Sequence, residues 1–174
     1  MSLIDIEIDG LTRSIVEIGT SESLSTTIVW WHELKPSQRR LGKWNFNWQG
    51  EVKMGRKVAA LTIRGDRKVQ GLISFAAQRD HVFVHLVESA PHNVGNRKKF
   101  IGVPGNLFAF ACQESLRLGF EGSLSFDAKT ELIGHYMESL GAFQVARSQR
   151  MIITQDAAQR LITSYFEETD QWPS

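Results

Sequence analysis

The chain has 174 residues, of which 42% are hydrophobic and 22% charged, and its 20 Lys and Arg nearly balance 19 Asp and Glu. Length and composition predict one globular domain with its own core, and they exclude a disordered tail, a coiled coil and a polybasic protein. A lone cysteine excludes an internal disulfide and a multi-cysteine zinc site, and no apolar run reaches the roughly 20 residues of a membrane helix, so we expect a soluble, cytoplasmic protein.

The positive charges are concentrated in the middle of the chain. Residues 35–68 carry ten Lys and Arg and only two acidic residues. Such a stretch attracts an anionic ligand, nucleic acid included, when its cations share one surface. Half of these cations flank strand patterns, where polar positions normally face water, so the favoured interpretation is a solvated face.

The first third of the chain predicts a hairpin followed by an irregular region. Residues 3–8 alternate Ile with acidic side chains, the period of a half-buried strand, and Asp9-Gly10 favours a tight turn that pairs residues 11–18 back on it. Pro36 fits the start of a short helix, and four of the five tryptophans lie within 30–48. We expect this cluster either to line a substrate pocket or to form core.

The rest of the chain predicts strands and helices in a definite order. Residues 57–64, 67–77 and 81–88 form an antiparallel meander. A helix follows from 102–105 to Gly119, then a strand over 122–126, a helix from Thr130 to Gly141, one or two strands within 143–154, and a terminal helix. This order predicts an α+β domain with a mixed, mostly antiparallel sheet flanked by helices and an added C-terminal helix.

A glycine-bearing loop leads from the third meander strand into the first long helix. The N–H groups of a first helical turn lack intrahelical partners and bind anions, phosphates in particular. The cations Arg97, Lys98 and Lys99 stand just before this helix. The loop is neither a P-loop nor a dinucleotide fingerprint, because the required Lys-Ser/Thr pair and third glycine are missing.

The block from 81 to 143 resembles the core of the GNAT superfamily of acyl-CoA-dependent N-acetyltransferases. The matching positions are Lys99, Gly102 and Pro104 in the loop and the run from His135 to Ala142 in the second helix. The resemblance covers 57–154, so 1–56 would form the N-terminal and acceptor-side region and 155–174 the C-terminal helix. It implies one GNAT-like domain over 1–174 that transfers acetyl from acetyl-CoA, without a metal, to a primary amine by direct attack in a ternary complex.

The same resemblance implies which residues hold the coenzyme. The backbone of two strand residues would bond the pantetheine arm, and the loop with its helix N-terminus would hold the diphosphate. Lys99 replaces a planar Gln or Arg, and Pro104 removes one backbone donor. The coenzyme-binding residues expected in this way are Val87, Ser89, Lys99, Ile101, Gly102, Val103, Gly105 and Asn106.

Two side chains are the expected catalytic groups. Glu88 follows Val84 and Leu86 on one expected strand face, would be partly desolvated, and is the first candidate for general base, with His92 second. Tyr136 is the candidate general acid, or else a packed core tyrosine. The family's usual tyrosine position is held by Met137, which has no proton to donate.

Other reactive side chains favour structural roles. His81 and His85 alternate onto one strand face, but no further residue has metal-ligand spacing, and Cys112 fits a helix core. We expect a small-molecule or peptide amine as acceptor, without a membrane or nucleic acid as partner, and a homodimer is left open.

Two alternatives to an enzyme remain at this stage. The first is a non-catalytic acyl-CoA-binding protein of GNAT fold, which Pro104 and Met137 both permit. The second is an RNA-binding module, because residues 102–105 match a bare G-x-x-G, although the preceding stretch is a loop and not the helix that a KH domain requires.

Overall fold

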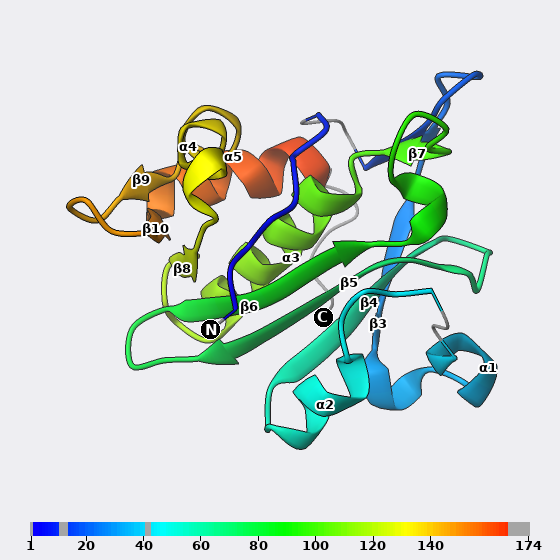
Figure 1. Cartoon of the computed structure of the whole chain (residues 1–174), viewed down its shortest axis with the longest axis horizontal. Coiled ribbons are helices and arrows are strands. Elements are labelled where there is room, and N and C mark those ends of the chain that lie inside the picture. Colours follow the sequence, from blue (N-terminus) through cyan, green and yellow to red (C-terminus); the bar gives the residue numbers. More distant parts are fainter. Residues whose placement is uncertain (1, 11–13, 41–42, 167–174) are drawn as a thin grey trace.

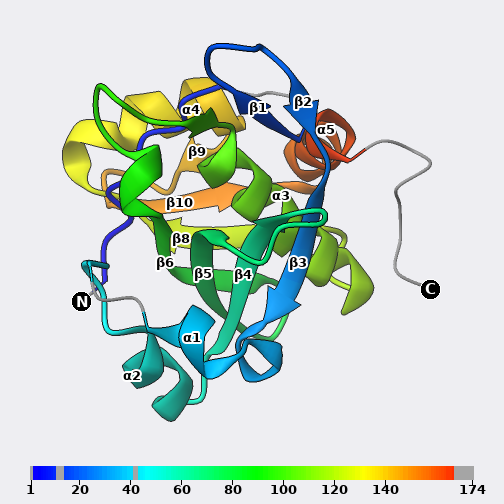
Figure 2. The same ribbon diagram turned by 90° about the vertical axis from the view of Figure 1, so that its right-hand side faces the viewer.

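The fold is known from a computed structural model that describes residues 2–10, 14–40 and 43–166. Its main sheet has seven strands in the order β3-β4-β5-β6-β8-β10-β9, and a small sheet has the order β2-β1-β7 (Figure 2). All neighbouring strands are antiparallel except β6 and β8, which are parallel. The strands are β1 (Ile15–Glu17), β2 (Ser23–Leu24), β3 (Thr26–Trp30), β4 (Lys57–Ile63), β5 (Val69–Ala77), β6 (Val82–Ser89), β7 (Phe100–Ile101), β8 (Leu124–Asp127), β9 (Phe143–Gln144) and β10 (Arg150–Ile153).

Helices cover both faces of the main sheet (Figure 1). α3 and α5 pack on one face, α1 and α2 lie on the other, and α4 lies beside β9. Short 3-10 turns precede α1 and α4. The helices are α1 (Pro36–Arg39), α2 (Trp48–Lys53), α3 (Val103–Arg117), α4 (Ile133–Leu140) and α5 (Gln155–Tyr165), and the 3-10 turns are Trp31–Glu33, Pro91–Asn93 and Thr130–Leu132.

The sheet separates two hydrophobic cores. The larger core lies between the sheet and α3, with Leu107 and Phe108 fully buried, and α5 and α4 close it. The smaller core lies on the opposite face, where Trp31 and Trp48 pack against Leu72 of β5. Alternate residues of β4 and β5 enter alternate cores, as the period of a strand requires when both faces are covered.

The structure confirms the predicted α+β class, the meander of β4, β5 and β6, and the helix that begins near Pro36. The predicted N-terminal hairpin is wrong. β1 pairs with β2 and β7, and residues 2–10 pair elsewhere. Residues 11–13 lie outside the described part, as does the end of the chain from 167. No helix among the described residues is long and apolar enough to cross a membrane.

Candidate active site

The parallel strands β6 and β8 are paired only at one end. Their register joins Val82 to Leu124 and Phe83 to Ser125, and no further residues pair. Beyond this point β8 still pairs with β10 on its other side, as far as Asp127. The two central strands therefore separate, and an opening forms in the middle of the sheet.

The N-terminal segment, residues 2–10, fills this opening (Figure 1). The Ile4 N–H donates to the Asp127 carbonyl at 2.7 Å, and the Lys129 N–H donates to the Ile4 carbonyl at 3.0 Å. The Ala128 N–H between them points to Gln149, on the β10 side, so Ile4 lies on the β6 side of the β8 end. The segment runs parallel to β8 and takes the place that a continued β6–β8 ladder would occupy.

The middle of the N-terminal segment is bonded to α4. The Tyr136 hydroxyl accepts from the Ile6 N–H at 3.1 Å and donates to the Ile6 carbonyl at 2.5 Å. His135 Nε2 accepts the Ile8 N–H at 2.7 Å, so this nitrogen carries no proton in that contact. Ile4 and Ile8 are buried in the larger core, so the segment is held by both hydrogen bonds and apolar packing.

The segment ends with a carboxylate at the N-terminus of α3. Asp9 Oδ1 accepts from the Gly102 N–H at 3.0 Å, and Asp9 Oδ2 lies 3.2 Å from Lys98 Nζ. Gly102 is the N-cap of this 15-residue helix and has a φ of +95°, a conformation that glycine adopts without strain. A helix N-terminus favours negative charge. Asp9 therefore occupies the anion position that the sequence predicts for a diphosphate.

The other predicted diphosphate-binding residues surround this position but do not all face it. Lys99 Nζ lies over the Phe100 ring, 5.3 Å from its centroid. Ile101 belongs to β7 and pairs with Val16, while Val103 and Asn106 are fully buried. The Asn106 Oδ1 atom is buried without a hydrogen-bond partner among the described residues. Of this group, Gly102 alone has a recorded bond to the anion.

Gly105 allows a close approach between α3 and α5. A Cβ atom at Gly105 would lie 1.8 Å from the Tyr165 hydroxyl, so any side chain there would collide with the tyrosine ring. The Tyr165 hydroxyl in turn donates to the Gly10 carbonyl at 2.5 Å. The space above Gly105 thus holds part of α5, which also fixes the end of the N-terminal segment.

A β-bulge in β6 changes which side chains face each core. Phe75 of β5 pairs with Val84, and its neighbour Ser74 pairs with Leu86, so His85 is an extra residue without a partner in β5. Val84 faces the larger core, whereas Leu86 faces the smaller one. The expectation that Val84, Leu86 and Glu88 share one strand face is therefore wrong, because the bulge reverses the alternation.

Glu88 lies on the face of the sheet away from α3 and is bonded to the segment before α2. Its carboxylate accepts from the Asn45 N–H at 2.6 Å, the Phe46 N–H at 3.2 Å and Trp48 Nε1 at 3.0 Å. The residue is 6% exposed. A buried carboxylate that accepts three hydrogen bonds is suited to holding a loop, so the geometry does not favour Glu88 as general base.

Replacing Glu88 by glutamine is expected to lower the stability of the protein by about 2 kcal/mol, because charge-assisted hydrogen bonds weaken and one donor loses its acceptor. For a chain of this size the melting temperature should fall by roughly 4–8 °C. Differential scanning calorimetry at neutral pH measures this, with Glu131→Gln, a change on the exposed 3-10 turn before α4, as the control. An unchanged melting temperature in Glu88→Gln would contradict the assigned structural role.

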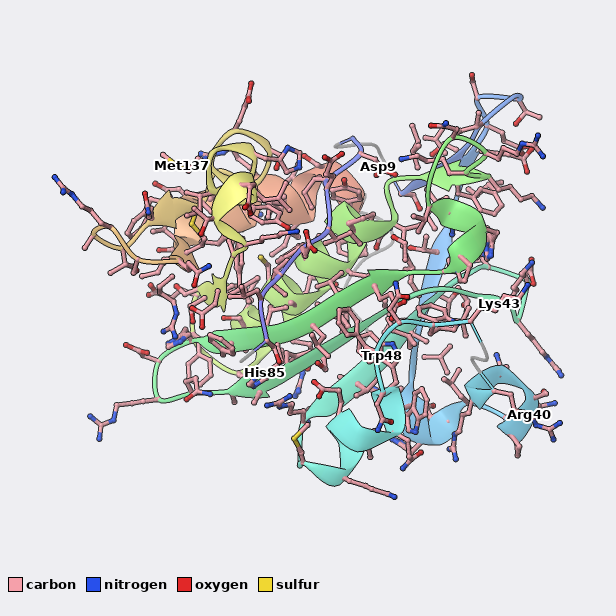
Figure 3. All side chains as sticks on the ribbon, in the orientation of Figure 1. Asp9, Arg40, Lys43, Trp48, His85 and Met137 are labelled. Carbon is pink, nitrogen blue, oxygen red and sulfur yellow. The ribbon has the colours of Figure 1, made fainter. Side chains whose placement is uncertain are left out.

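Tyr136 points into the opening and Met137 does not. Tyr136 is fully buried, and its hydroxyl meets the N-terminal segment, whereas Met137 is 47% exposed on the outer side of α4 (Figure 3). Burial raises the pKa of Tyr136, so the hydroxyl stays protonated at neutral pH. The position held by Met137 is therefore not the one that reaches the opening.

His85 is a polar side chain on β6 beyond the last β6–β8 pair, and the sequence indicated it only as a doubtful metal ligand. It lies at the bulge, two residues beyond the last β6–β8 pair, and is half-buried with its ring 4.7 Å from that of Phe83. Desolvation, then the positive charge of Arg56, lowers the pKa of His85. A neutral imidazole at neutral pH is able to accept a proton. The bulge that places it here leaves no periodicity signal in the sequence.

The tryptophan-rich region contributes to both core and cavities. Trp48 and Trp31 are buried in the smaller core. Trp30 lines a cavity of about 660 Å³, and Trp44 lines another of about 490 Å³. The core role is thus confirmed for Trp31 and Trp48, and Trp31 also lines the 660 Å³ cavity. The substrate pocket stays a prediction.

The remaining reactive groups have structural surroundings. Cys112 is fully buried in α3, as expected, and burial raises the pKa of its thiol. Within the described residues, no group of three or more His, Cys, Asp or Glu side chains is arranged to hold a metal ion. His92 Nε2 lies 2.7 Å from Gln70 Oε1, in the 3-10 turn that follows β6.

Comparison with known proteins gives structural neighbours only. No model of a protein family and no curated protein matches the sequence. A bacterial toxin matches with a TM-score of 0.57 and 12% identity over 83% of this chain and 98% of its own. A mutant of the toxin AtaT, bound to the C-terminus of the antitoxin AtaR, matches with a TM-score of 0.53 and 14% identity over 80% of this chain and 98% of its own. AtaTR bound with acetyl-CoA matches with a TM-score of 0.53 and 14% identity over 78% of this chain and 97% of its own.

Proposed function

We propose that this chain, which has the fold of the GNAT acetyltransferases as its sequence predicts, is an acyl-CoA-dependent acyltransferase. The expected reaction is transfer of acetyl from acetyl-CoA to a primary amine, without a metal. A structural neighbour bound with acetyl-CoA supports this choice of donor. At this low identity the fold alone is shared, so the proposal depends on the geometry of the opening.

The observation that carries the proposal is the way in which the N-terminal segment fills the opening. An extended chain is bonded like an added strand at the end of β8, and an anion at its end sits on the N-terminus of α3. A pantetheine arm that ends in a diphosphate resembles this segment, because it too is a narrow polar chain with negative charge at its end. This likeness supports a site for a ligand of this shape, in which Asp9 stands in the proposed position of a phosphate.

The residues fit acyl-CoA only after the N-terminal segment has left. Gly102 and the first turn of α3 would then face a diphosphate, with Lys98 released from Asp9 to pair with it. The backbone of Val87 and Ser89, on the part of β6 beyond the β8 pairing, is proposed to bond the arm. Bound acyl-CoA supplies the activated acyl group.

The chain's own groups are proposed to move the protons. His85, neutral at pH 7, accepts the proton of the attacking amine, directly or through a water. The Tyr136 hydroxyl, freed from the Ile6 carbonyl, donates to the departing thiolate. Glu88 takes no part in the chemistry and holds the segment before α2 on the sheet.

The proposal is tested by thermal melting with acetyl-CoA and by release of free thiol across a panel of amines. A ligand at about 100 times its Kd adds ~2.7 kcal/mol, which raises the melting temperature by roughly 5–10 °C for a domain of this size. Tyr136→Phe is expected to retain the shift and to release thiol 10²–10⁴ times more slowly. Met137→Leu, outside the opening, is the control. A melting temperature that millimolar acetyl-CoA and CoA leave unchanged would overturn the proposal.

A second candidate is a GNAT-fold protein that binds acyl-CoA without catalysis. Met137 favours it, because this residue holds the family's usual tyrosine position on α4, has no proton to donate and is 47% exposed. This candidate predicts a melting shift with acetyl-CoA and no thiol release with any amine. The two assays together therefore separate the candidates.

A further inference from the structure

A second cavity lies on the face of the sheet opposite α3, near the ends of β6 and α1. It has a volume of about 490 Å³, and its walls carry Arg40, Arg67 and Lys68 together with Trp44 and His92. We call it the basic pocket. The sequence favours a solvated face for the cations of residues 35–68, but the fold gathers three of them around one hollow. Arg40 and Lys43 both extend from this corner of the molecule (Figure 3).

Within residues 2–10, 14–40 and 43–166, no acidic side chain forms an ion pair with the cations of the basic pocket. None of its lining residues is acidic. Among the described residues, Arg40, Arg67 and Lys68 make no side-chain ion pair, although cations elsewhere do, such as Arg56 with Glu51 and Arg117 with Glu114. The nearby carboxylate of Asp66 accepts the Lys68 backbone N–H at 2.9 Å. Like charges held around a hollow create a positive potential that favours an anion.

A hydrogen-bond network fixes the histidine in the wall. The Asn93 side chain accepts from the Phe100 N–H at 3.2 Å and donates to Gln70 Oε1 at 2.9 Å, which makes Gln70 Oε1 an acceptor. His92 Nε2, 2.7 Å from the same oxygen, is therefore the protonated nitrogen. Burial is the main cause that lowers the pKa of His92; Lys68 and Lys99 lower it further, and Asp66 opposes them. The contributions of the two lysines indicate positive charge near the ring.

An aromatic ring forms another wall, and buried contacts hold it there. Trp44 is half-buried, and the residues that follow it, Asn45 and Phe46, are bonded to the buried Glu88 carboxylate. Gln38 of α1 donates to the Arg67 carbonyl at 2.6 Å and so joins α1 to the β4–β5 turn. The indole and the three cations are thus placed by the fold around the same space.

We propose that the basic pocket binds a nucleotide, with Arg40, Arg67 and Lys68 around its phosphate and Trp44 against its base. Guanidinium and ammonium groups are the usual phosphate donors, and an indole stacks on any base. The volume suits one nucleotide unit. The same chemistry is offered by a free mononucleotide or by one nucleotide of a single-stranded RNA.

Isothermal titration calorimetry of the full chain tests this with AMP, adenosine, inorganic phosphate and a short single-stranded RNA. AMP or the RNA is expected to bind at least tenfold more tightly than adenosine or phosphate alone, and the tighter of the two identifies the source. Arg67→Ala and Lys68→Ala should each weaken binding by roughly tenfold, since one charge-assisted contact is lost. Trp44→Leu should weaken nucleotide binding more than either of these two variants does. Arg79→Ala, an exposed cation in the β5–β6 turn, should leave it unchanged.

Three results would overturn the proposal. The first is absence of binding by both AMP and the RNA at low ionic strength. The second is a loss in Arg79→Ala equal to that in Arg67→Ala, which would mean general charge attraction. The third is that Arg67→Ala and Lys68→Ala lose acetyl-CoA binding as well as nucleotide binding, which would make the pocket part of the coenzyme site. Failure of acetyl-CoA to bind at all leaves the nucleotide measurement unaffected, so the two proposals fail separately.

Discussion

Replacing Asp9 by alanine is expected to tighten acetyl-CoA binding by roughly tenfold, because the change removes charge-assisted contacts that hold the N-terminal segment in the opening. Asp9 bonds the Gly102 N–H and lies 3.2 Å from Lys98 Nζ, and both partners then become available to a diphosphate. The expected change in the free energy of acetyl-CoA binding equals the contribution of the Asp9 contacts to keeping the N-terminal segment in the opening. Calorimetric titration of wild type and variant with acetyl-CoA measures it.

The matched control for this experiment is Asp5→Ala. Asp5 lies on the same segment and pairs with Lys129 at 3.3 Å, but both side chains are exposed. Exposed pairs contribute little, so acetyl-CoA affinity should hardly change. Tighter binding in Asp9→Ala alone supports a segment that competes with the coenzyme. Weaker binding in Asp9→Ala would mean that Asp9 is needed by the ligand, and the idea of competition would be abandoned.

A point substitution in the N-terminal segment tests the competition more directly than removal of the whole segment. Ile4 and Ile8 are buried in the larger core, so a chain without them would lose apolar packing as well as the contacts in the opening. Deleting large buried aliphatic side chains typically costs about 2–5 kcal/mol each. A truncated protein that fails to bind acetyl-CoA would therefore not distinguish a lost fold from a lost site.

Replacing His85 by glutamine is expected to slow acyl transfer by 10²–10⁴, the usual contribution of a general base. Burial and the nearby Arg56 lower the pKa of His85, so its neutral, proton-accepting form persists to more acidic pH than for a free histidine. In the wild type, kcat/KM should fall only as the pH drops below the ordinary histidine range. In the variant this limb of the pH profile should disappear. Steady-state kinetics from acidic to alkaline pH check both.

The control for His85 is His81→Gln on the same strand edge. His81 Nδ1 is bonded to Asp80 Oδ1 at 2.7 Å in the turn before β6. Its loss should leave the rate and the pH profile unchanged, while acetyl-CoA should bind His85→Gln as it binds the wild type. If His85→Gln keeps the acidic limb of the wild-type pH profile, His85 is not the general base.

Local sequence signals predicted the regular elements well. β4, β5 and β6 alternate or run apolar between turn residues, and α3 ends next to a glycine with a φ of +88°. These features depend on neighbours in the chain, so one sequence is enough to find them. The same signals do not report a bulge. Val84 and Glu88 were consequently given to one face, although the bulge puts them on opposite faces of the sheet.

The N-terminal segment shows the opposite case, in which a correct local pattern has an unpredicted partner. Its alternation of Ile and acidic residues does describe an extended chain with one buried side. Its hydrogen-bonding partners, however, are Asp127, Lys129 and Tyr136, more than a hundred residues away. Periodicity says which side is buried but not against what, so the predicted hairpin was wrong.

By itself the sequence determined the fold class and the order of β4, β5, β6, α3, β8, α4 and α5, and it predicted the anion-binding character of the α3 N-terminus, because each follows from spacing within short stretches of chain. Only the tertiary structure decided that Asp9 occupies this anion position, that Glu88 is a buried clamp, and that three cations of a basic stretch surround one pocket. Those facts are contacts between distant segments. These contacts form only when the chain folds, so they cannot be read from the sequence of any one segment.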